Sequence, residues 1–365
     1  MNGTRTWKKF TALLAATALT AGLLAGCGGG TGETQNTESG QPDPSPSQSQ
    51  TAETRTVTDM SGVEVEIPAE VTQYADAWMA HNEVIVMLDE AEGLVATVQT
   101  PQSAAWMYFV QPNMYNALST FGDEFNLEEL VALEPDVVFA SNEELRDQLA
   151  SVGIPLVNVM FTNYDEMKQS ITLTGEVLGG DAVQMAEDYV AYLDDVLAQL
   201  EELVSSLSEE EKPTVLHGNS VYDLNIDGSN TIIDAWITAA GGTNAAAEVE
   251  GNMQTVTMEQ ILVWDPDVII TGTKSEVEEI MNDPEWAGLT AVQNGQVYTN
   301  PKGVFSWDRY GVEEALQLQW VANLLHPELF NIDIRTQVKD FYETFLHYTL
   351  TDEQVELILN AEAPQ

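Results

Sequence analysis

The chain has 365 residues, a formal net charge of −47 at neutral pH and one cysteine. This charge argues against nucleic acid and anionic lipid surfaces as partners, because both are themselves polyanions. A lone cysteine has no partner for an internal disulfide, so the folded part must be held together by its hydrophobic core. The length allows two domains of ordinary size.

The first 26 residues have the pattern of a secretory signal peptide. Arg5, Lys8 and Lys9 make a basic start, and residues 10–26 are apolar or small apart from scattered threonines. The Leu-Ala-Gly directly before Cys27 resembles a lipobox, which implies cleavage before Cys27 and attachment of palmitate or a similar acyl chain to it. We therefore expect a lipid-anchored protein at the extracytoplasmic face of the cell membrane. The alternative is a transmembrane helix, for which a 17-residue run is short.

Residues 27–54 are predicted to form a lipid-anchored, disordered linker. They are rich in Gly, Ser, Thr, Gln, Pro and Glu and contain no large apolar residue. Such a segment has too little apolar surface to offset the entropy lost on folding. A flexible linker suits any tethered lipoprotein, so it does not name the function.

Short apolar runs with β-branched residues alternate with segments of helical spacing in residues 55–365. Continuous apolar runs are typical of strands that are buried on both faces, and their alternation with helices indicates an α/β fold with mainly parallel sheets. The predicted strands are residues 95–98, 136–140, 155–159, 214–217 and 267–271.

One segment breaks this alternation. Residues 181–211 contain no Gly or Pro, and their apolar residues keep a 3.6-residue period as far as Val204. A glycine pair precedes the segment and Pro213 follows it, as expected at the two ends of a helix. We predict one long rigid helix here, joining an N-terminal lobe (55–180) to a C-terminal lobe (212–365). The alternative is a long helix inside a single domain.

A 14-residue pattern occurs twice, with an offset of 131 residues, and supports the two-lobe interpretation. Each copy opens with a potential capping box, which is Asn126 with Glu129 in the first and Thr257 with Gln260 in the second. Each then runs through a short helix to an acidic residue, Pro-Asp and a predicted strand. The two copies are residues 126–139 and 257–270.

In this order, and behind a lipobox, these features resemble the substrate-binding proteins of ABC importers for iron complexes, haem and cobalamin. The resemblance also rests on Arg55–Pro68, on Pro284–Tyr298 and on Trp307-Asp308-Arg309. It implies two Rossmann-like lobes bridged by one helix, with the ligand in the cleft between them. It also implies a monomer that delivers its ligand to an ABC permease dimer with its ATPase subunits.

The resemblance assigns a docking role to Glu128 and Glu259, which occupy equivalent positions of the two repeats. In the family, one carboxylate of each lobe meets arginines of the permease. The alternative is structural, because an acid in the first turn of a helix is stabilised by the helix dipole.

Loops that follow the carboxyl ends of strands are expected to line the cleft. Their aromatic residues suit a large, flat ligand, namely a ferric siderophore, haem or a corrinoid, and the protein is expected to have no cofactor of its own. The candidate ligand-binding residues are Trp78, His81, Trp106, Tyr108, Tyr164, Tyr222, Trp307 and Arg309. Each aromatic residue and each histidine has a core role as its alternative.

Arg309 is the sharpest of these candidates. Of the 12 basic residues, three lie in the signal peptide, so it is one of nine that remain. Its guanidinium could clamp a carboxylate or an oxyanion, and its removal is expected to weaken binding at least about tenfold with little loss of stability. The alternative is an ion pair with Asp308 or Glu313. His326 and His347 are predicted to lie at the surface.

Three other functions compete with a chelate receptor. An oxyanion receptor for molybdate or tungstate would use Arg309 and polar loop groups. A receptor for free zinc or manganese needs several converging ligands, and the chain has four histidines without metal-site spacing. An enzyme is not expected, because the sequence carries no nucleophile elbow, Walker loop, zinc-protease motif or paired cysteines, and no metal site is predicted.

Overall fold

The computed structural model describes residues 53–122 and 125–365. The predicted signal peptide, Cys27 and nearly all of the 27–54 linker lie outside the described residues. Among the helices of the described part, none combines the length and the apolar character needed to cross a membrane.

The first described element is an antiparallel hairpin of β1 (Thr54–Thr58) and β2 (Glu64–Pro68). Val57, Val65 and Ile67 are buried, while most of the residues between them are exposed, so the hairpin alternates as a half-buried sheet should. The hairpin covers the segment Arg55–Pro68, which carries part of the family resemblance.

The N-terminal lobe contains a five-stranded parallel sheet in the order β5-β4-β3-β6-β7. Its strands β3 and β6 are fully buried, because helices cover both faces of the sheet. The strands are β3 (Tyr74–Asp76), β4 (Leu94–Thr97), β5 (Leu118–Ser119), β6 (Val137–Ala140) and β7 (Leu156–Asn158). The helices are α1 (His81–Met87), α2 (Ala105–Val110), η1 (Pro112–Asn116), α3 (Leu127–Ala132), α4 (Arg146–Ala150) and α5 (Tyr164–Leu178).

The C-terminal lobe repeats this plan with a four-stranded parallel sheet in the order β10-β8-β12-β13. Its strands are β8 (Thr214–Gly218), β10 (Thr243–Asn244), β12 (Val268–Thr271) and β13 (Val297–Thr299), with a separate pair β9 (Asn225–Ile226) and β11 (Gln254–Thr255). The helices are η2 (Glu209–Glu211), α7 (Ile232–Ala239), α8 (Met258–Trp264), α9 (Lys274–Asn282), α10 (Thr290–Gln293), α11 (Glu314–Leu325), α12 (Ile334–Phe345) and α13 (Asp352–Leu359). The predicted α/β class is confirmed.

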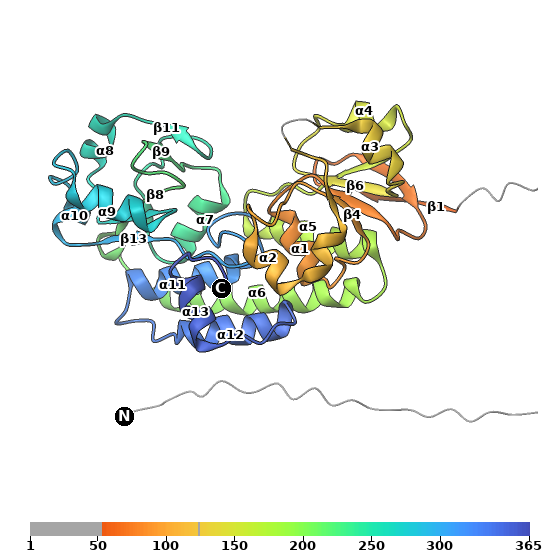
Figure 1. Cartoon of the computed structure of the whole chain (residues 1–365). Helices are drawn as coiled ribbons and strands as arrows, with labels where there is room; N and C mark the ends of the chain where they lie inside the picture. Colours follow the sequence, from red (N-terminus) through yellow and green to blue (C-terminus); the bar gives the residue numbers. More distant parts are fainter. Residues whose placement is uncertain (1–52, 123–124) are drawn as a thin grey trace, which may run out of the picture. The chain divides into compact units, whose positions relative to one another are not determined.

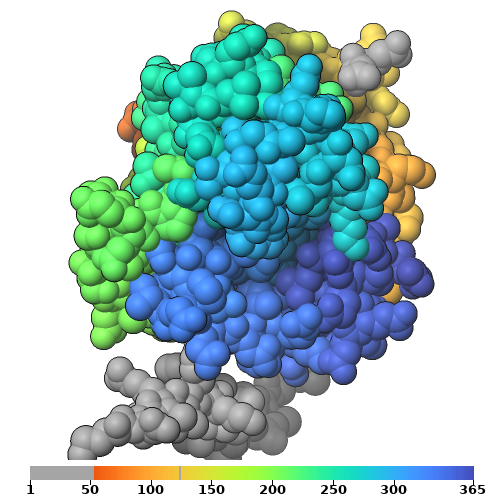
Figure 2. Space-filling model, turned by 90° about the vertical axis from the view of Figure 1, so that its left-hand side faces the viewer, coloured from red at the N-terminus to blue at the C-terminus, as the bar shows by residue number. Residues whose placement is uncertain are grey.

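The connecting helix α6 (Ala182–Val204) runs beneath both sheets, beside α5 and α11 (Figure 1). Seen from the C-terminal lobe, the green residues near its end lie beside the blue residues of the last helices (Figure 2). Its apolar stripe, which includes Tyr189 and Leu193, is buried.

The helix α6 is shorter than the predicted 181–211, because residues 205–211 form turns and η2. Acidic residues crowd this end, where the helix dipole disfavours negative charge. Ser208 and Glu211 close a capping box that starts η2 instead of extending α6.

The structure gives a physical reason for the repeated acidic-Pro-Asp motif. Glu134 and Asp265, which are 131 positions apart, both have a positive φ, at 51° and 41°, so each turns the chain sharply after its helix. The aspartates two positions later bond the chain just before β3 or at the start of β8. Asp136 Oδ2 accepts hydrogen bonds from the N–H groups of Thr72 and Gln73, and Asp267 Oδ2 accepts from Thr214. The motif therefore joins neighbouring strands in both lobes.

The two capping boxes differ. Thr257 and Gln260 form both reciprocal bonds at the start of α8. At α3 the Asn126 side chain accepts from the N–H groups of Glu128 and Glu129. The reciprocal bond, from the Asn126 N–H to the Glu129 carboxylate, is not among the bonds of the described residues. The first predicted box is therefore an ordinary N-cap.

Replacing Asp136 tests this role of the repeat. Asp136→Ala should lower the free energy of unfolding by about 1–3 kcal/mol, because it removes several hydrogen bonds to a carboxylate. Urea unfolding followed by circular dichroism measures the loss. The matched control is Asp340→Ala at an exposed position of α12, which should change stability by less than about 0.5 kcal/mol. An equal loss in both variants would contradict the assigned role.

Candidate functional site

The candidate site lies where loops from the carboxyl ends of the two sheets approach each other, the usual ligand position in such sheets. Trp78 follows β3 and Phe161 follows β7 in the N-terminal lobe, while Tyr310 lies between β13 and α11 in the C-terminal lobe. The centroids of the three rings are 5.6 Å apart in each pair. We call these three rings the aromatic bridge, because they join the lobes at the base of the cleft.

Tyr310 is held in a conformation that a tyrosine rarely adopts. Its φ is +61°, and the Asn252 side chain donates a hydrogen bond to its hydroxyl. Leu224, Asn230 and Met253, on loops of the same lobe, also have φ between 52° and 61°. Backbone strain of this kind gathers at functional sites.

Arg309, next to Tyr310, belongs to a buried charge cluster with Asp227, Asp308 and His217. Its Nε and Nη2 atoms donate to Asp308 Oδ2 at 2.9 Å and 2.6 Å, and Nη2 also donates to Asp227 Oδ2 at 3.2 Å. These bonds fix the orientation of the guanidinium. Among the hydrogen bonds of the described residues, none uses Nη1, and the side chain keeps 14% exposure.

His217 completes the cluster. Its Nδ1 lies 2.9 Å from Asp227 Oδ2, while its Nε2 lies 3.1 Å from Asp308 Oδ2 in poor hydrogen-bond geometry and has no other partner in the described part of the chain. Among the described residues, no group of three or more side chains has the arrangement of a metal site.

The positive and negative groups of the cluster stabilise each other's charged forms. Burial alone would lower the pKa of His217, but the carboxylates of Asp227 and Asp308 outweigh it and raise that pKa. Burial alone would raise the pKa of Asp308, but Arg309 and then His217 hold it well below its usual range. With His217 protonated, two positive groups face two negative groups, so the cluster can hold Arg309 rigidly without a net charge of its own.

A cavity of about 410 Å³ lies beside the loop that follows Phe161. The loop after β7, the residues just before α7 and α7 itself form its walls, so both lobes contribute. Its lining includes the polar side chains of Thr162, Asn163, Asn230, Thr231 and Asp234.

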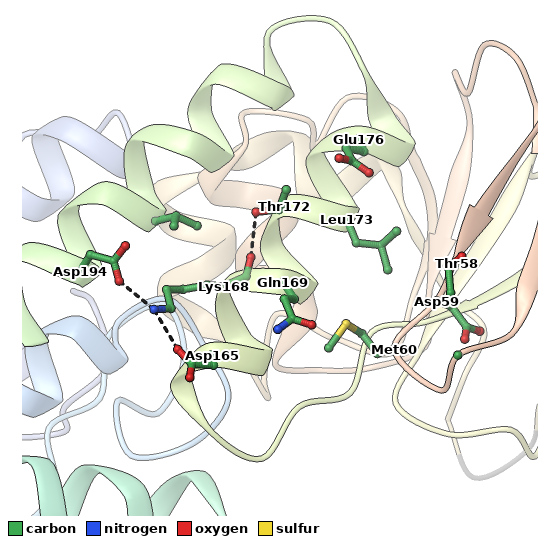
Figure 3. A pocket seen from close by; sticks show the side chains of 12 residues that line it. Thr58, Asp59, Met60, Asp165, Lys168, Gln169, Thr172, Leu173, Glu176 and Asp194 are labelled. Carbon is green, nitrogen blue, oxygen red and sulfur yellow. Dashed lines mark hydrogen bonds and ion pairs between the residues drawn. The ribbon is translucent and has the colours of Figure 1, made fainter.

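A second cavity, of about 800 Å³, lies away from the cleft, between the hairpin loop and helices α5 and α6 (Figure 3). Its basic residue Lys168 is already paired, with Nζ at 2.8 Å from Asp194 Oδ1 and 3.1 Å from Asp165 Oδ1. Glu176 adds another acid to the lining. This groove therefore offers no free positive group to an anion.

Trp78 and Arg309, two of the predicted ligand-binding residues, are partly exposed at the cleft. The other aromatic candidates have structural partners. Trp106 donates to the Glu362 carbonyl, Tyr108 to the Gln99 carbonyl, Tyr164 to Glu314, Tyr222 to Asp283 and Trp307 to Glu313. These bonds give the five residues a structural role. Their contact with a ligand stays a prediction.

The histidines have structural environments as well. His81 is buried, with Nδ1 at 2.8 Å from Asp76 and Nε2 at 2.8 Å from Thr174. His326, which the sequence places at the surface, is in fact buried, because its Nε2 lies 2.9 Å from the Gly241 carbonyl oxygen and its ring packs near Phe330. His347 is exposed, as predicted.

The predicted docking residues Glu128 and Glu259 are both exposed, in the first turns of α3 and α8. These helices lie at the upper edges of their lobes in Figure 1. Large apolar side chains near them are also exposed, including Val131 and its repeat equivalent Leu262. Docking itself stays a prediction.

Sequence reasoning missed several residues of the site. Asp227 follows a two-residue strand that was not predicted, and Asn252 lies in a loop. Glu83 lies in the first turn of α1, the rest of which is apolar, and this contrast was a usable signal of a buried acid. Nothing in the local sequence indicates that Asp227 meets Arg309, because 82 residues separate them.

Two parallel-sheet lobes, joined by a helix and facing each other across strand-end loops, define the class of two-lobed substrate-binding proteins. The chain belongs to the periplasmic binding protein family, whose pattern matches residues 83–303. It is therefore a substrate-binding protein of the ABC-transporter type and not an enzyme.

Three relatives illustrate the range of the family. The molybdate-binding protein MolA of Haemophilus influenzae is 27% identical over 80% of this chain and 90% of its own length. Its molybdate-bound structure has a TM-score of 0.73 at 25% identity, covering 81% of this chain and 99% of that one. The uncharacterized ABC transporter substrate-binding lipoprotein YvrC of Bacillus subtilis is 25% identical over 88% of this chain and 99% of its length. The Fe(3+)-citrate-binding protein YfmC of B. subtilis is 25% identical over 51% of this chain and 59% of its length.

The charge cluster makes a prediction that corrects the stability expected for Arg309. Arg309→Ala should lower the free energy of unfolding by about 3–5 kcal/mol, because Asp227 and Asp308 would stay buried without their cation. Urea unfolding at neutral pH measures the loss. Lys168→Ala, which breaks exposed ion pairs instead, should cost no more than about 1 kcal/mol. A similarly small loss for Arg309→Ala would contradict the buried cluster.

Proposed function

We propose that this protein is a lipid-anchored, extracytoplasmic receptor that binds a small oxyanion of the molybdate and tungstate type and delivers it to an ABC permease. The proposal rests on the hydrogen bonding of the Arg309 side chain. Two aspartates orient its guanidinium, and its Nη1 is left without a bond among the described residues, while the side chain keeps 14% exposure. A guanidinium that is oriented beforehand loses little entropy when it binds an oxyanion.

The aromatic bridge also favours a small ligand. Trp78, Phe161 and Tyr310 touch one another across the lobes, so a ligand as wide as haem or a corrin would have to part them. A tetrahedral anion beside Arg309 would leave these contacts in place. The similarity to MolA, which extends over most of both chains, supports the same ligand class.

A metal chelate is the second candidate, and the aromatic bridge is the observation that favours it. Its rings offer an apolar, polarizable surface to a flat complex if the lobes open. The Fe(3+)-citrate-binding relative supports this possibility over about half of the chain. The sequence alone favours the chelate. The contact among the three rings favours the oxyanion instead, because a wide chelate would have to part them.

Calorimetric titration of the purified chain with sodium molybdate, sodium tungstate, sodium sulfate, ferric citrate, haemin and cobalamin tests the ligand. We expect molybdate and tungstate to bind, and Arg309→Lys to weaken that binding at least about tenfold, because lysine cannot reproduce the guanidinium geometry. Lys168→Ala is the matched control for a cation outside the cleft and should leave affinity unchanged. Binding of a chelate alone would overturn the oxyanion assignment, and sensitivity to Lys168→Ala would move the site to the groove of Figure 3.

The proposed delivery to a permease depends on Glu128 and Glu259, which are exposed on α3 and α8. Replacing both with alanine should reduce ligand-stimulated ATP hydrolysis by the reconstituted transporter at least about tenfold, as expected when charge pairs are lost from an interface. Ligand affinity should not change, because both side chains are exposed and neither has a hydrogen bond to a site residue among the bonds of the described residues. Glu129→Ala, an exposed acid on the same helix, is the control. Normal transport by the double variant would reject these two residues as docking groups.

A further inference from the structure

Three fully buried carboxyl groups lie at the junction between the lobes, directly behind the candidate site. Glu83 is on α1 of the N-terminal lobe, while Glu313 and Glu314 lie at the start of α11 in the C-terminal lobe, and each has 0% exposure. Among the ion pairs of the described residues, none includes any of the three. Buried carboxyl groups without a cation are stable only when they are protonated or strongly hydrogen-bonded.

Glu83 and Glu313 meet across the lobes. Glu83 Oε1 accepts a hydrogen bond from the Glu313 N–H at 3.2 Å. Glu83 Oε2 has no hydrogen-bond partner among the described residues, which suits an oxygen that carries a proton. The space around it is tight, since a Cβ on Gly311 would lie 1.9 Å from Oε2.

Glu313 also fixes the chain that leads to the site. Its Oε1 accepts from the Tyr342 hydroxyl at 2.6 Å and from the Trp307 ring N–H at 2.9 Å, and its Oε2 accepts from the Phe305 N–H at 3.0 Å. Residues 305–308 lead directly to Arg309. The position of the guanidinium therefore depends on the state of this carboxyl group.

Glu314 links the aromatic bridge to the other lobe. Its Oε1 accepts from the Tyr310 N–H at 2.9 Å, and its Oε2 accepts from the Tyr164 hydroxyl at 3.1 Å. The first bond helps to hold Tyr310 in its left-handed conformation, and the second crosses to α5 of the N-terminal lobe.

We propose that Glu83, Glu313 and Glu314 form a proton-holding junction that positions Arg309 and Tyr310 for ligand, and that ionisation of this junction loosens the site and weakens binding. They are positioning residues and do not touch the ligand. The proposal rests on the proposed function, because it assumes that Arg309 and Tyr310 contact the ligand.

The direction of the effect follows from burial. Burial, and then the charge of Glu313, raise the pKa of Glu83 well above its usual range, and burial also raises the pKa of Glu314. Burial raises the pKa of Glu313 to about 7. A group with a raised folded-state pKa stabilises the fold fully below its unfolded value, about 4.3 for glutamate, and that stability is lost as pH rises through the folded-state pKa. The loss for Glu313 therefore spans about pH 4.3 to about pH 7 and is complete above that range, where the native carboxyl group is itself ionised.

Among the described residues, the groups that face the junction from neighbouring elements are tyrosines, which are Tyr164 on α5, Tyr189 on α6 and Tyr342 on α12. On Glu314, Asp308 raises the pKa and Arg309 lowers it, and these two residues already pair with each other. His217, in the charge cluster, also loses its proton as pH rises, so the test must separate it from the junction.

Ligand-free protein gives the first test. Infrared spectra at neutral pH should contain the C=O stretch of neutral carboxylic acids, which Glu83→Gln and Glu314→Gln should each reduce and the exposed control Glu343→Gln should not. The wild-type melting temperature should fall as pH rises from about 5 to about 8, and Glu83→Gln should flatten this fall, because glutamine cannot ionise. Identical pH profiles for the wild type, Glu83→Gln and Glu314→Gln would overturn the proposal. Testing both positions keeps the result decisive if one variant does not fold.

Binding gives the second test, with sodium molybdate as the probe. Its dissociation constant should rise about tenfold over the same pH range in the wild type, the usual size of coupling between linked sites. The rise should be much smaller in Glu83→Gln, which leaves His217 intact, and unchanged in Glu343→Gln. A profile that Glu83→Gln does not alter would overturn the coupling. If molybdate does not bind at all but the infrared bands behave as expected, the junction stands and the oxyanion assignment fails.

Discussion

The structure depends on buried carboxyl groups between the lobes, where Glu83 Oε1 accepts a hydrogen bond from the Glu313 N–H at 3.2 Å. An isolated buried carboxylate is costly, so each such group requires a proton or a full set of donors. Tyr342, Trp307 and the Phe305 N–H supply those donors to Glu313. The contact thereby fixes the segment that carries Arg309 and Tyr310, and it holds α1 of one lobe against α11 of the other.

Hydrogen bonds to buried charged groups also hold the candidate site. Arg309 is surrounded by two carboxylates and a histidine, which neutralise its charge and fix the orientation of its guanidinium. The body carries a strongly negative field, so long-range attraction does not draw an anion to the cleft. Recognition would instead depend on short-range geometry, namely a preorganised guanidinium beside three rings that close the cleft.

The sequence was sufficient for the architecture because the architecture has local causes. The strands are visible in the sequence as apolar runs. The repeat contains the same turn and an equivalent aspartate in each lobe, and these aspartates, Asp136 and Asp267, accept hydrogen bonds from the chain just before β3 and at the start of β8. The length of α6 was overestimated because periodicity continued into an acidic segment where the helix dipole and a Ser208 cap oppose it. The site was less predictable. Arg309 and Trp78, predicted from their rarity and position, lie in the candidate site, and their contact with ligand stays a prediction. Asp227 and Asn252 reach the site through distant contacts that no local pattern encodes, and the apolar run after Glu83 does not reveal its partner.

Binding of a small oxyanion at Arg309, between the lobes, can be checked in a crystal structure of the protein grown with sodium molybdate, with data collected at the molybdenum absorption edge. We expect one strong anomalous peak within hydrogen-bond distance of Arg309 Nη1, beside an aromatic bridge that stays closed. A peak elsewhere on the chain, or a chelate bound between the lobes with Trp78, Phe161 and Tyr310 parted around it, would rule out an oxyanion site at Arg309.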